Sequence, residues 1–399
     1  MKKKIVIHDF AIHPFALQLS KELSKNGFEI FHLFFQSFLS PNNININYAE
    51  SDSLDFHLES INISKYNKYN FLKRKKYEIL YGNLVCKKLD IIKPDIVILC
   101  TTPLDPTKII LKYCKKRNIK FIFWLQDIYS IAIKNILSKK IPFIGSFIGD
   151  YYSHLEKRIL RESDHIIAIA ADFLPFLTSS QVSLDKVSVL NNWAPINEIP
   201  ALSKTNSWSI ENKLTESFNF LYSGTIGFKH NPNILIKLAQ YFKEEKNIRI
   251  IIVSEGLAVE WLKIKVHDFN LSNIVFYNFQ PFDKLPLILA AADVLVALLE
   301  KDAGIYSVPS KVLTYLCAGR PLLLSVPKQN LAANIVEKNS AGLVSEPNDD
   351  ESFLNNAKEL YNNKKLRELF SDNARNYAEL NSDIERITSW FINLFEKYI

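Results

Sequence analysis

Short apolar runs alternate with amphipathic stretches along the whole chain, and this alternation restricts the fold more than any other feature of the sequence. The runs expected to form strands are residues 4–8, 29–35, 95–100, 120–124, 165–168, 186–190, 218–222, 248–253, 274–277, 294–298 and 321–325. Continuous apolar runs of this length are typical of parallel strands covered by helices on both faces. The alternation therefore predicts an α/β protein built on parallel sheets.

A chain of 399 residues is long enough for two domains of ordinary size. Residues 201–217 are polar and lack periodicity, so we interpret them as an interdomain linker. The sequence thus predicts Rossmann-like domains at 1–200 and 218–372, with ligands beyond the carboxyl ends of their strands. A C-terminal segment at 373–399 includes an amphipathic helix, which we expect to pack back on the N-terminal domain.

Several features indicate a cytoplasmic protein. The basic start at residues 1–4 precedes a stretch that is too short and too polar for a signal peptide. The longest apolar stretch, 285–299, contains a proline and an aspartate and is shorter than the roughly 20 residues of a membrane span. The four cysteines form no CxxC pair and are expected to be buried and reduced.

The net charge of +7 is concentrated in the N-terminal half. Residues 1–200 hold 27 Lys and Arg against 19 Asp and Glu, whereas residues 201–399 hold 22 against 23. Basic stretches at 65–76 and 112–117 are usually solvated helix faces, and no nucleic-acid-binding motif accompanies them. With the apolar stretch 143–148 downstream, we interpret this half as docking on an anionic membrane surface, as a peripheral protein at the inner face.

Familiar catalytic fingerprints are missing from the sequence. It contains no G-x-G-x-x-G after the first strand, no Walker motif, no H-E-x-x-H, no D-x-D and no G-x-S-x-G. The eight histidines show no metal-ligand spacing. A dehydrogenase, an ATPase, a zinc hydrolase and a serine hydrolase are all disfavoured, and we expect no metal.

Two helix starts in the C-terminal half carry residues that suit an anion. In the loop after the strand at 218–222, Gly224 and Gly227 allow backbone N–H groups to approach a ligand and Lys229 adds a cation. In the second, Ser310 can cap a helix whose first turn holds Lys311, where the helix dipole disfavours a cation unless an anion is present. The alternative for both is a plain turn with a solvated lysine.

These two segments, 222–232 and 308–321, resemble glycosyltransferase family 4, and in particular bacterial polysaccharide enzymes of the colanic-acid and O-antigen fucosamine transferase type. Further matching segments fall in the expected order at 123–127, 254–256, 280–282 and 341–344. The resemblance implies the GT-B fold, in which two Rossmann-like domains face a central cleft. It also implies a retaining sugar transfer, in which the leaving diphosphate helps to deprotonate the acceptor.

The sequence departs from the family pattern at three places. The family's pair of glutamates falls on Tyr306 and Thr314, its arginine after the loop glycine is Thr225, and its N-terminal glycine-rich loop is replaced by residues 8–14. The donor-binding residues expected from the motifs and the resemblance are Gly224, Thr225, Gly227, Lys229, Glu255, Gly256, Gln280, Tyr306, Ser310, Lys311 and Thr314.

The catalytic candidates are Asp127 and His8, each at the end of an N-terminal strand. A helix-capping Asp127, a structural His8 and a solvated Glu255 are the alternatives. The predicted donor is a UDP- or GDP-sugar, with no other cofactor. The predicted acceptor is a lipid-diphosphate-linked glycan of a bacterial surface polysaccharide such as O-antigen or capsule. A sugar-nucleotide epimerase and a catalytically decayed membrane-associated scaffold are the alternative functions.

Overall fold

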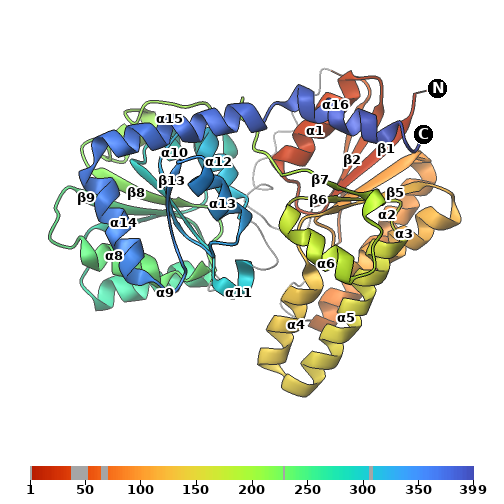
Figure 1. The fold of residues 1–399 in the computed structure, drawn as a ribbon, viewed down its shortest axis with the longest axis horizontal. Coiled ribbons are helices and arrows are strands. Elements are labelled where there is room, and N and C mark those ends of the chain that lie inside the picture. The colour runs from red at the N-terminus through yellow and green to blue at the C-terminus, as the bar shows by residue number, and fades with distance from the viewer. Residues whose placement is uncertain (1, 37–52, 64–70, 228–229, 305–308) are drawn as a thin grey trace. The chain divides into compact units, whose positions relative to one another are not determined.

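The computed structural model describes residues 2–36, 53–63, 71–227, 230–304 and 309–399. The chain forms two compact units, one made of Met1–Asn192 with Asp383–Ile399 and one made of Trp193–Ser382. Each unit contains a parallel sheet with helices packed around it (Figure 1). The α/β class predicted from the alternation of apolar runs and amphipathic stretches is confirmed.

The sheet of the first unit has seven strands in the order β3-β2-β1-β4-β5-β6-β7, and neighbouring strands are parallel. The strands are β1 (Lys4–Asp9), β2 (Glu29–Phe35), β3 (Phe56–Ile61), β4 (Ile96–Cys100), β5 (Lys120–Leu125), β6 (His165–Ala168) and β7 (Val187–Val189). The strand order reverses between β1 and β4, and ligands of such sheets bind beyond the carboxyl ends of the strands at this point.

The helices of the first unit come from both ends of the chain. They are α1 (Pro14–Lys25), α2 (Phe71–Ile92), α3 (Leu104–Lys116), α4 (Tyr129–Lys140), α5 (Pro142–Glu162), α6 (Leu174–Ser179) and α16 (Ile384–Phe395). Helix α16 packs on α1, with the ring of Phe391 5.3 Å from Trp124 and the ring of Phe395 5.7 Å from Phe28. Its apolar face is thus part of the core of this unit.

The second unit has six parallel strands in the order β10-β9-β8-β11-β12-β13, which reverses between β8 and β11. They are β8 (Phe218–Ser223), β9 (Ile248–Val253), β10 (Ile274–Tyr277), β11 (Val294–Leu298), β12 (Leu322–Ser325) and β13 (Gly342–Ser345). The helices are α7 (Ser207–Glu211), α8 (Asn233–Tyr241), α9 (Leu257–Asp268), α10 (Leu285–Ala290), α11 (Lys301–Gly304), α12 (Lys311–Cys317), α13 (Leu331–Lys338), α14 (Asp350–Asn362) and α15 (Lys364–Asn381).

Two separate hydrophobic clusters explain why the strands of the second unit are apolar throughout. Leu221 and Ile251 belong to one cluster, whereas their neighbours Phe220 and Ile250 belong to the other. Successive side chains of a strand point to opposite faces, so both faces of this sheet are buried.

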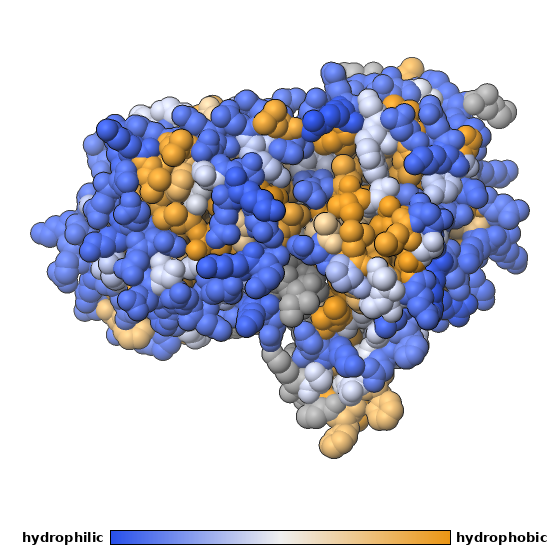
Figure 2. Space-filling view, in the orientation of Figure 1, coloured by the Kyte–Doolittle hydropathy of each residue, from blue (hydrophilic) through white to orange (hydrophobic). Residues whose placement is uncertain are grey.

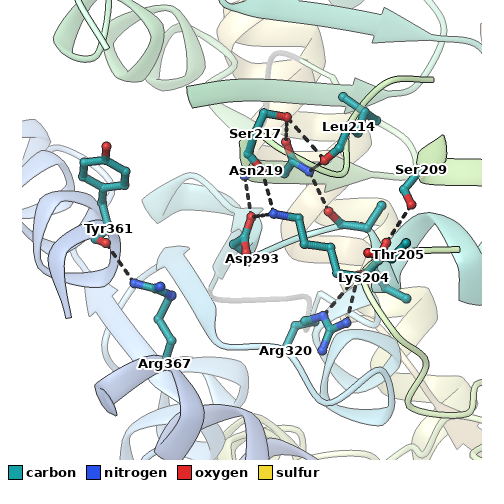
Figure 3. A network of polar contacts seen from close by, with 12 residues as sticks. Lys204, Thr205, Ser209, Leu214, Ser217, Asn219, Asp293, Arg320, Tyr361 and Arg367 are labelled. Atoms are coloured by element: carbon teal, nitrogen blue, oxygen red, sulfur yellow. Dashed lines mark hydrogen bonds and ion pairs between the residues drawn. The ribbon is translucent and has the colours of Figure 1, made fainter. Parts of the chain in front are cut away.

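The segment 201–217, interpreted from its polarity as a linker, is packed on the second unit. Lys204 forms an ion pair with Asp293 at 2.6 Å, and the same Nζ donates to the carbonyl of Ser217 (Figure 3). Arg320 donates to the carbonyl of Leu202, and Trp208 of α7 is buried. Polar side chains attach this segment to the amino end of the sheet, which is why its composition resembles that of a linker.

Among the described residues, no helix combines the length and the apolar character needed to cross a membrane. The four cysteines are free thiols, with Cys100, Cys114 and Cys317 buried and Cys86 partly exposed.

Candidate functional site

The loop after β8 lies beside the first turn of α12. Gly224 adopts a φ of +105°, a conformation that glycine tolerates best, and its Cα faces the end of the Lys311 side chain. The Lys311 Nζ lies 3.5 Å from the centre of the Tyr222 ring and 3.4 Å from the carbonyl oxygen of Thr225, to which it donates. The fold thus brings Gly224, Thr225 and Lys311 together at the carboxyl end of β8.

Two buried tyrosines hold this loop in place. The hydroxyl of Tyr315 accepts from the backbone N–H of Ser223 at 2.9 Å and donates to the carbonyl of the same residue at 3.0 Å. The hydroxyl of Tyr222 donates to the carbonyl of Thr225 at 2.8 Å. Tyr315 follows Lys311 by one helical turn, and this i, i+4 spacing was the signal in the sequence that could have identified it.

The backbone N–H groups of the two loop glycines are both hydrogen-bonded within the protein. The N–H of Gly224 donates to the carbonyl of Val253, and the N–H of Gly227 donates to Nδ1 of His230 at 2.9 Å. Among the described residues beside this loop, Lys311 supplies a positive charge. Lys229, the other predicted cation, lies outside the described residues.

Helix α12 begins without the expected side-chain cap. Ser310 occupies the N-cap position but has helical backbone angles, and its side chain makes no capping hydrogen bond. Thr314 lies on the same helix and is partly exposed, whereas Tyr306 lies outside the described residues. The first turn of α12 therefore contributes Lys311 rather than a capping hydroxyl.

The remaining predicted donor residues lie after β9 and β10. The Glu255 carboxylate accepts from the backbone N–H of Phe279 at 3.0 Å, which ties the two loops together. Gly256 starts α9 with a φ of +110°, and the Gln280 side chain donates to the carbonyl of Asn278. Since β9 is adjacent to β8 in a parallel sheet, these loops lie at the same edge as Lys311.

In the first unit, Asp9 and His13 form a hydrogen-bonded pair at the carboxyl end of β1. His13 Nδ1 lies 2.9 Å from the buried Asp9 carboxylate, and the hydroxyl of Thr101 donates to the same carboxylate at 2.6 Å. Burial would raise the pKa of Asp9, but the charge and hydrogen bond of His13 lower it well below its usual value.

The His13 imidazole remains 26% exposed. Burial opposes its protonation, but the charge and hydrogen bond of Asp9, with a further contribution from Asp127, raise its pKa. His13 lies in the segment that replaces the family's glycine-rich loop, and sequence reasoning missed it as a functional candidate. The Asp-x-x-x-His spacing of residues 9–13 was the available signal.

His8 is enclosed in the interior of the first unit. Its Nδ1 is hydrogen-bonded to Thr102 at 2.8 Å and its Nε2 to Tyr81 at 2.7 Å, and burial lowers its pKa to about 4. With both ring nitrogens used by the protein, His8 fits the alternative of a structural histidine.

Asp127 lies two residues beyond the end of β5 and is partly exposed. It does not cap α4: the backbone N–H groups of Tyr129 and Ser130 instead donate to the buried carboxylate of Glu156 at 2.9 and 3.0 Å. Burial raises the pKa of Glu156 to about 7. The capping alternative for Asp127 is thus unsupported, and the first unit places Asp127 near His13, close enough to affect its pKa.

Within the described ranges, no group of three or more His, Cys, Asp or Glu side chains is arranged to hold a metal ion. The chemistry-bearing residues fall into two sets, Gly224, Thr225 and Lys311 in the second unit, and Asp9, His13 and Asp127 in the first.

Comparison with known proteins identifies the second unit. Residues 204–377 match the model of the family described as glycosyl transferases group 1. These residues form a glycosyl transferases group 1 domain. The matched residues include the Gly224 loop and α12, so Lys311 lies within this group 1 domain.

Two relatives extend the match beyond the group 1 domain. An uncharacterized glycosyltransferase of Methanocaldococcus jannaschii is 22% identical over 253 residues, which are 62% of this chain and 62% of that protein. WcaI of Escherichia coli K12, described as a colanic acid biosynthesis glycosyl transferase, is 23% identical over 62% of this chain and 61% of its own length. The alignments thus cover less than two thirds of either relative.

The crystal structure of HepE from Anabaena in complex with UDP and glucose resembles the whole chain. The TM-score is 0.73 at 13% identity, covering 99% of this chain and 100% of HepE. At this identity the likeness establishes the fold. Two Rossmann-like units with seven and six parallel strands make this a GT-B protein, as the resemblance of the sequence implied.

Proposed function

We propose that this protein is a glycosyltransferase that moves a sugar from a nucleoside diphosphate sugar to a glycan acceptor in the synthesis of a bacterial surface polysaccharide. The observation that carries the proposal is the Lys311 ammonium, fixed over Tyr222 at the carboxyl end of β8 in a group 1 domain. A cation at this edge of a Rossmann-like sheet suits a diphosphate.

The donor-binding part of the proposal assigns the diphosphate to Lys311. As the bond between the sugar and the diphosphate breaks, negative charge develops on the leaving phosphate, and a prepositioned ammonium stabilises it. Tyr315 and Tyr222 hold the loop to which Lys311 donates. The complex of HepE with UDP and glucose supports UDP as the first nucleotide to test, with GDP as the alternative.

Further donor contacts are proposed for the loops on either side of Lys311. Glu255, Gly256 and Gln280 lie at the same sheet edge, and Thr314 lies on α12 with Lys311. Lys229 and Tyr306 remain proposals from the sequence motifs alone.

The acceptor-binding part of the proposal assigns Asp127 and the Asp9–His13 pair to the acceptor sugar. In a retaining transfer, the acceptor oxygen bonds to the anomeric carbon while its proton passes to the leaving phosphate oxygen. Asp127 would orient the acceptor by accepting a hydrogen bond from a neighbouring hydroxyl of the acceptor sugar, because the reacting hydroxyl gives its one proton to the phosphate. His13, whose protonated form is favoured by the Asp9 carboxylate, would in that form donate to a sugar oxygen.

We further propose that the acceptor is linked to a lipid diphosphate and that the enzyme is peripheral at the inner face of the membrane. The excess of 27 basic over 19 acidic residues in 1–200 supports an anionic surface as partner. The similarity to WcaI supports a surface polysaccharide as product. Neither the epimerase nor the scaffold alternative has an observation in its favour.

The test of this function is transfer of a labelled sugar from UDP- and GDP-sugars to a lipid-diphosphate glycan extract. We expect label to enter the lipid fraction with one of the two donors, and Asp127→Asn to abolish transfer while nucleotide binding persists. Isothermal titration calorimetry that detects no nucleotide binding, with or without a divalent metal, would refute the proposal.

A further inference from the structure

The free end of the helical hairpin formed by α4 and α5 carries exposed apolar side chains. The two helices pack against each other and are joined only through Ile141 (Figure 1). Phe143 is 87% exposed, Phe147 79%, Ile144 61% and Ile141 49%. Figure 2 shows hydrophobic residues exposed at this end of the hairpin. We refer to these four residues as the hairpin tip.

Packing between the two helices explains why the tip is exposed. A Cβ on Gly145 would lie 2.2 Å from the carbonyl oxygen of Leu137, and one on Gly149 would lie 2.8 Å from Cγ of Lys134. Only glycine fits at these positions, so this face of α5 is fixed against α4. At about 100° per residue, Phe143, Phe147 and Tyr151 lie on the opposite face, and they point away from α4.

Basic residues lie behind the tip on the same unit. Lys75 Nζ lies 4.8 Å from the ring centre of Tyr151 and 5.6 Å from that of Tyr152, which places the start of α2 beside α5. Tyr151 follows Phe143 by eight residues, or about 12 Å along the helix. Lys76 follows Lys75 and Lys73 lies two residues before it, and both are exposed. Apolar side chains at the end and lysines about two turns behind are typical of interfacial membrane proteins.

We propose that the hairpin tip inserts into the headgroup–acyl boundary of an anionic membrane, while Lys73 and Lys76 contact the lipid phosphates. A second copy is a poorer occupant, because the two Phe and two Ile side chains of the tip offer less than the ~800 Å² per partner of a standard protein interface. The lysines favour an anionic surface over a neutral one. The inference rests on the proposed function only in that a lipid-linked acceptor gives the docking a purpose.

Docking through the tip would also position the candidate acceptor residues. Helix α4 begins two residues after Asp127 and leads directly to the tip. Its 12 residues span about 18 Å. The hairpin would thus hold Asp127 roughly one helix length from the bilayer, on the side of the carboxyl ends of β4 and β5.

The experiment is sedimentation of the full-length protein with vesicles of phosphatidylglycerol and phosphatidylcholine, compared with phosphatidylcholine alone. We expect wild type to bind the anionic vesicles, and Phe143→Ser/Phe147→Ser to lower the partition coefficient at least tenfold. Ile91→Ser is the matched control, since Ile91 is 77% exposed on α2 of the same unit. It should bind like wild type.

The contribution of the lysines is tested with Lys73→Gln/Lys76→Gln, which leaves the Arg74–Glu78 ion pair intact. This variant should dissociate at lower salt than wild type, because the Debye length falls from about 10 Å at 0.1 M to about 3 Å at 1 M salt. The proposal is overturned if Phe143→Ser/Phe147→Ser sediments like wild type, if wild type fails to bind, or if the double serine variant changes the oligomeric state in size-exclusion chromatography.

Failure of this inference can be told apart from failure of the proposed function. Nucleotide binding, measured by thermal shift with UDP and GDP, should be the same in wild type and in both tip and lysine variants. Vesicle binding without any nucleotide binding would refute the function alone. Nucleotide binding without tip-dependent vesicle binding would refute the docking alone.

Discussion

His8 and His13 lie five positions apart on one strand and its following loop, yet the protein drives their protonation in opposite directions. His8 is buried among neutral partners, and its pKa falls to about 4. His13 shares a hydrogen bond with the Asp9 carboxylate, which raises its pKa. The sequence shows two histidines near a strand end, but the partner that decides each role becomes visible only in three dimensions.

Glu156 provides a pH test at the scale of one residue. Its folded pKa of about 7 exceeds the unfolded value of 4.5, so its contribution to stability is complete below pH 4.5 and is lost as the pH rises through 7. The full effect is roughly 3 kcal/mol at 1.36 kcal/mol per pKa unit. We expect the Tm of Glu156→Gln, measured relative to that of wild type at the same pH, to be higher at pH 8 than at pH 5.

The control for this measurement is Glu260→Gln on α9, an exposed glutamate. Its Tm should stay close to that of wild type, because a substitution at an exposed position changes the free energy of unfolding by less than about 0.5 kcal/mol. A pH-independent difference for Glu156→Gln would contradict the assignment of a carboxylate that titrates near neutrality.

At the scale of the elements, Lys311 at the start of α12 is expected to bind the diphosphate rather than the nucleoside. A charge-assisted hydrogen bond contributes roughly 1.5–3 kcal/mol, so Lys311→Ala should weaken nucleoside diphosphate binding about 10- to 150-fold. The unmodified nucleoside should bind almost unchanged. Calorimetric titration of both ligands, with Lys338→Ala on α13 as an exposed control, makes the comparison. Equal losses for both ligands would mean that Lys311 is structural.

Tyr315 connects α12 to the end of β8, and its hydroxyl is expected to stabilise the loop. Tyr315→Phe leaves the backbone N–H of the buried Ser223 without its partner, at a cost of roughly 1–3 kcal/mol. Urea denaturation should show a lower free energy of unfolding, and the nucleoside diphosphate should bind more weakly. Unchanged stability and affinity would show that the tyrosine ring alone is sufficient.

The strands with apolar runs were predictable because burial on both faces imposes a continuous pattern, as for β4 and β8. Strand β3 (Phe56–Ile61) was missed, since it lies at the sheet edge and carries polar residues. Segment 201–217 looked like a linker because much of its attachment to the second unit is polar: Lys204 pairs with Asp293, the Asn206 amide donates to the carbonyl of Leu287, and the carbonyl of Leu202 accepts from Arg320.

The candidate site was predictable only in part for a related reason. Lys311 and Asp127 were identified from motifs, but the internal bonding of the Gly224 and Gly227 amides depends on Val253 and His230. Likewise, Glu156 caps α4 from 26 residues beyond Ser130, a pairing that no local pattern encodes. Local sequence patterns predicted the helices and strands. Contacts with residues distant in the sequence determine which polar groups can bind a ligand.

At the scale of the whole molecule, the buried neutral histidines predict that acid destabilises the first unit before the second. His8, His32 and His165 all belong to the first unit, and burial lowers the pKa of each to about 4. A depressed pKa contributes stability above the unfolded value of 6.5 that is lost as the pH falls toward 4. The raised pKa values of His13, Glu78 and Glu156 in the same unit contribute in the opposite sense, whereas the lowered pKa of the Asp9 carboxyl adds to the loss of stability in acid.

Hydrogen exchange followed by mass spectrometry at pH values from 7 to 4.5 would test this order. We expect protection to be lost first in peptides from 71–192 and 383–399 and later in peptides from 193–382, after correction for the intrinsic exchange rate. Simultaneous loss in both groups of peptides would contradict the prediction.

The first unit is assembled from two ends of the chain, and this has a consequence for biosynthesis. The second unit is continuous from Trp193 to Ser382, so the ribosome has delivered all of its residues while the first unit still lacks α16. Until residues 383–399 emerge, Trp124 lacks its contact with Phe391 and Phe28 lacks its contact with Phe395. The first unit is therefore synthesised first but completed last, because its hydrophobic core stays incomplete until α16 has left the ribosome.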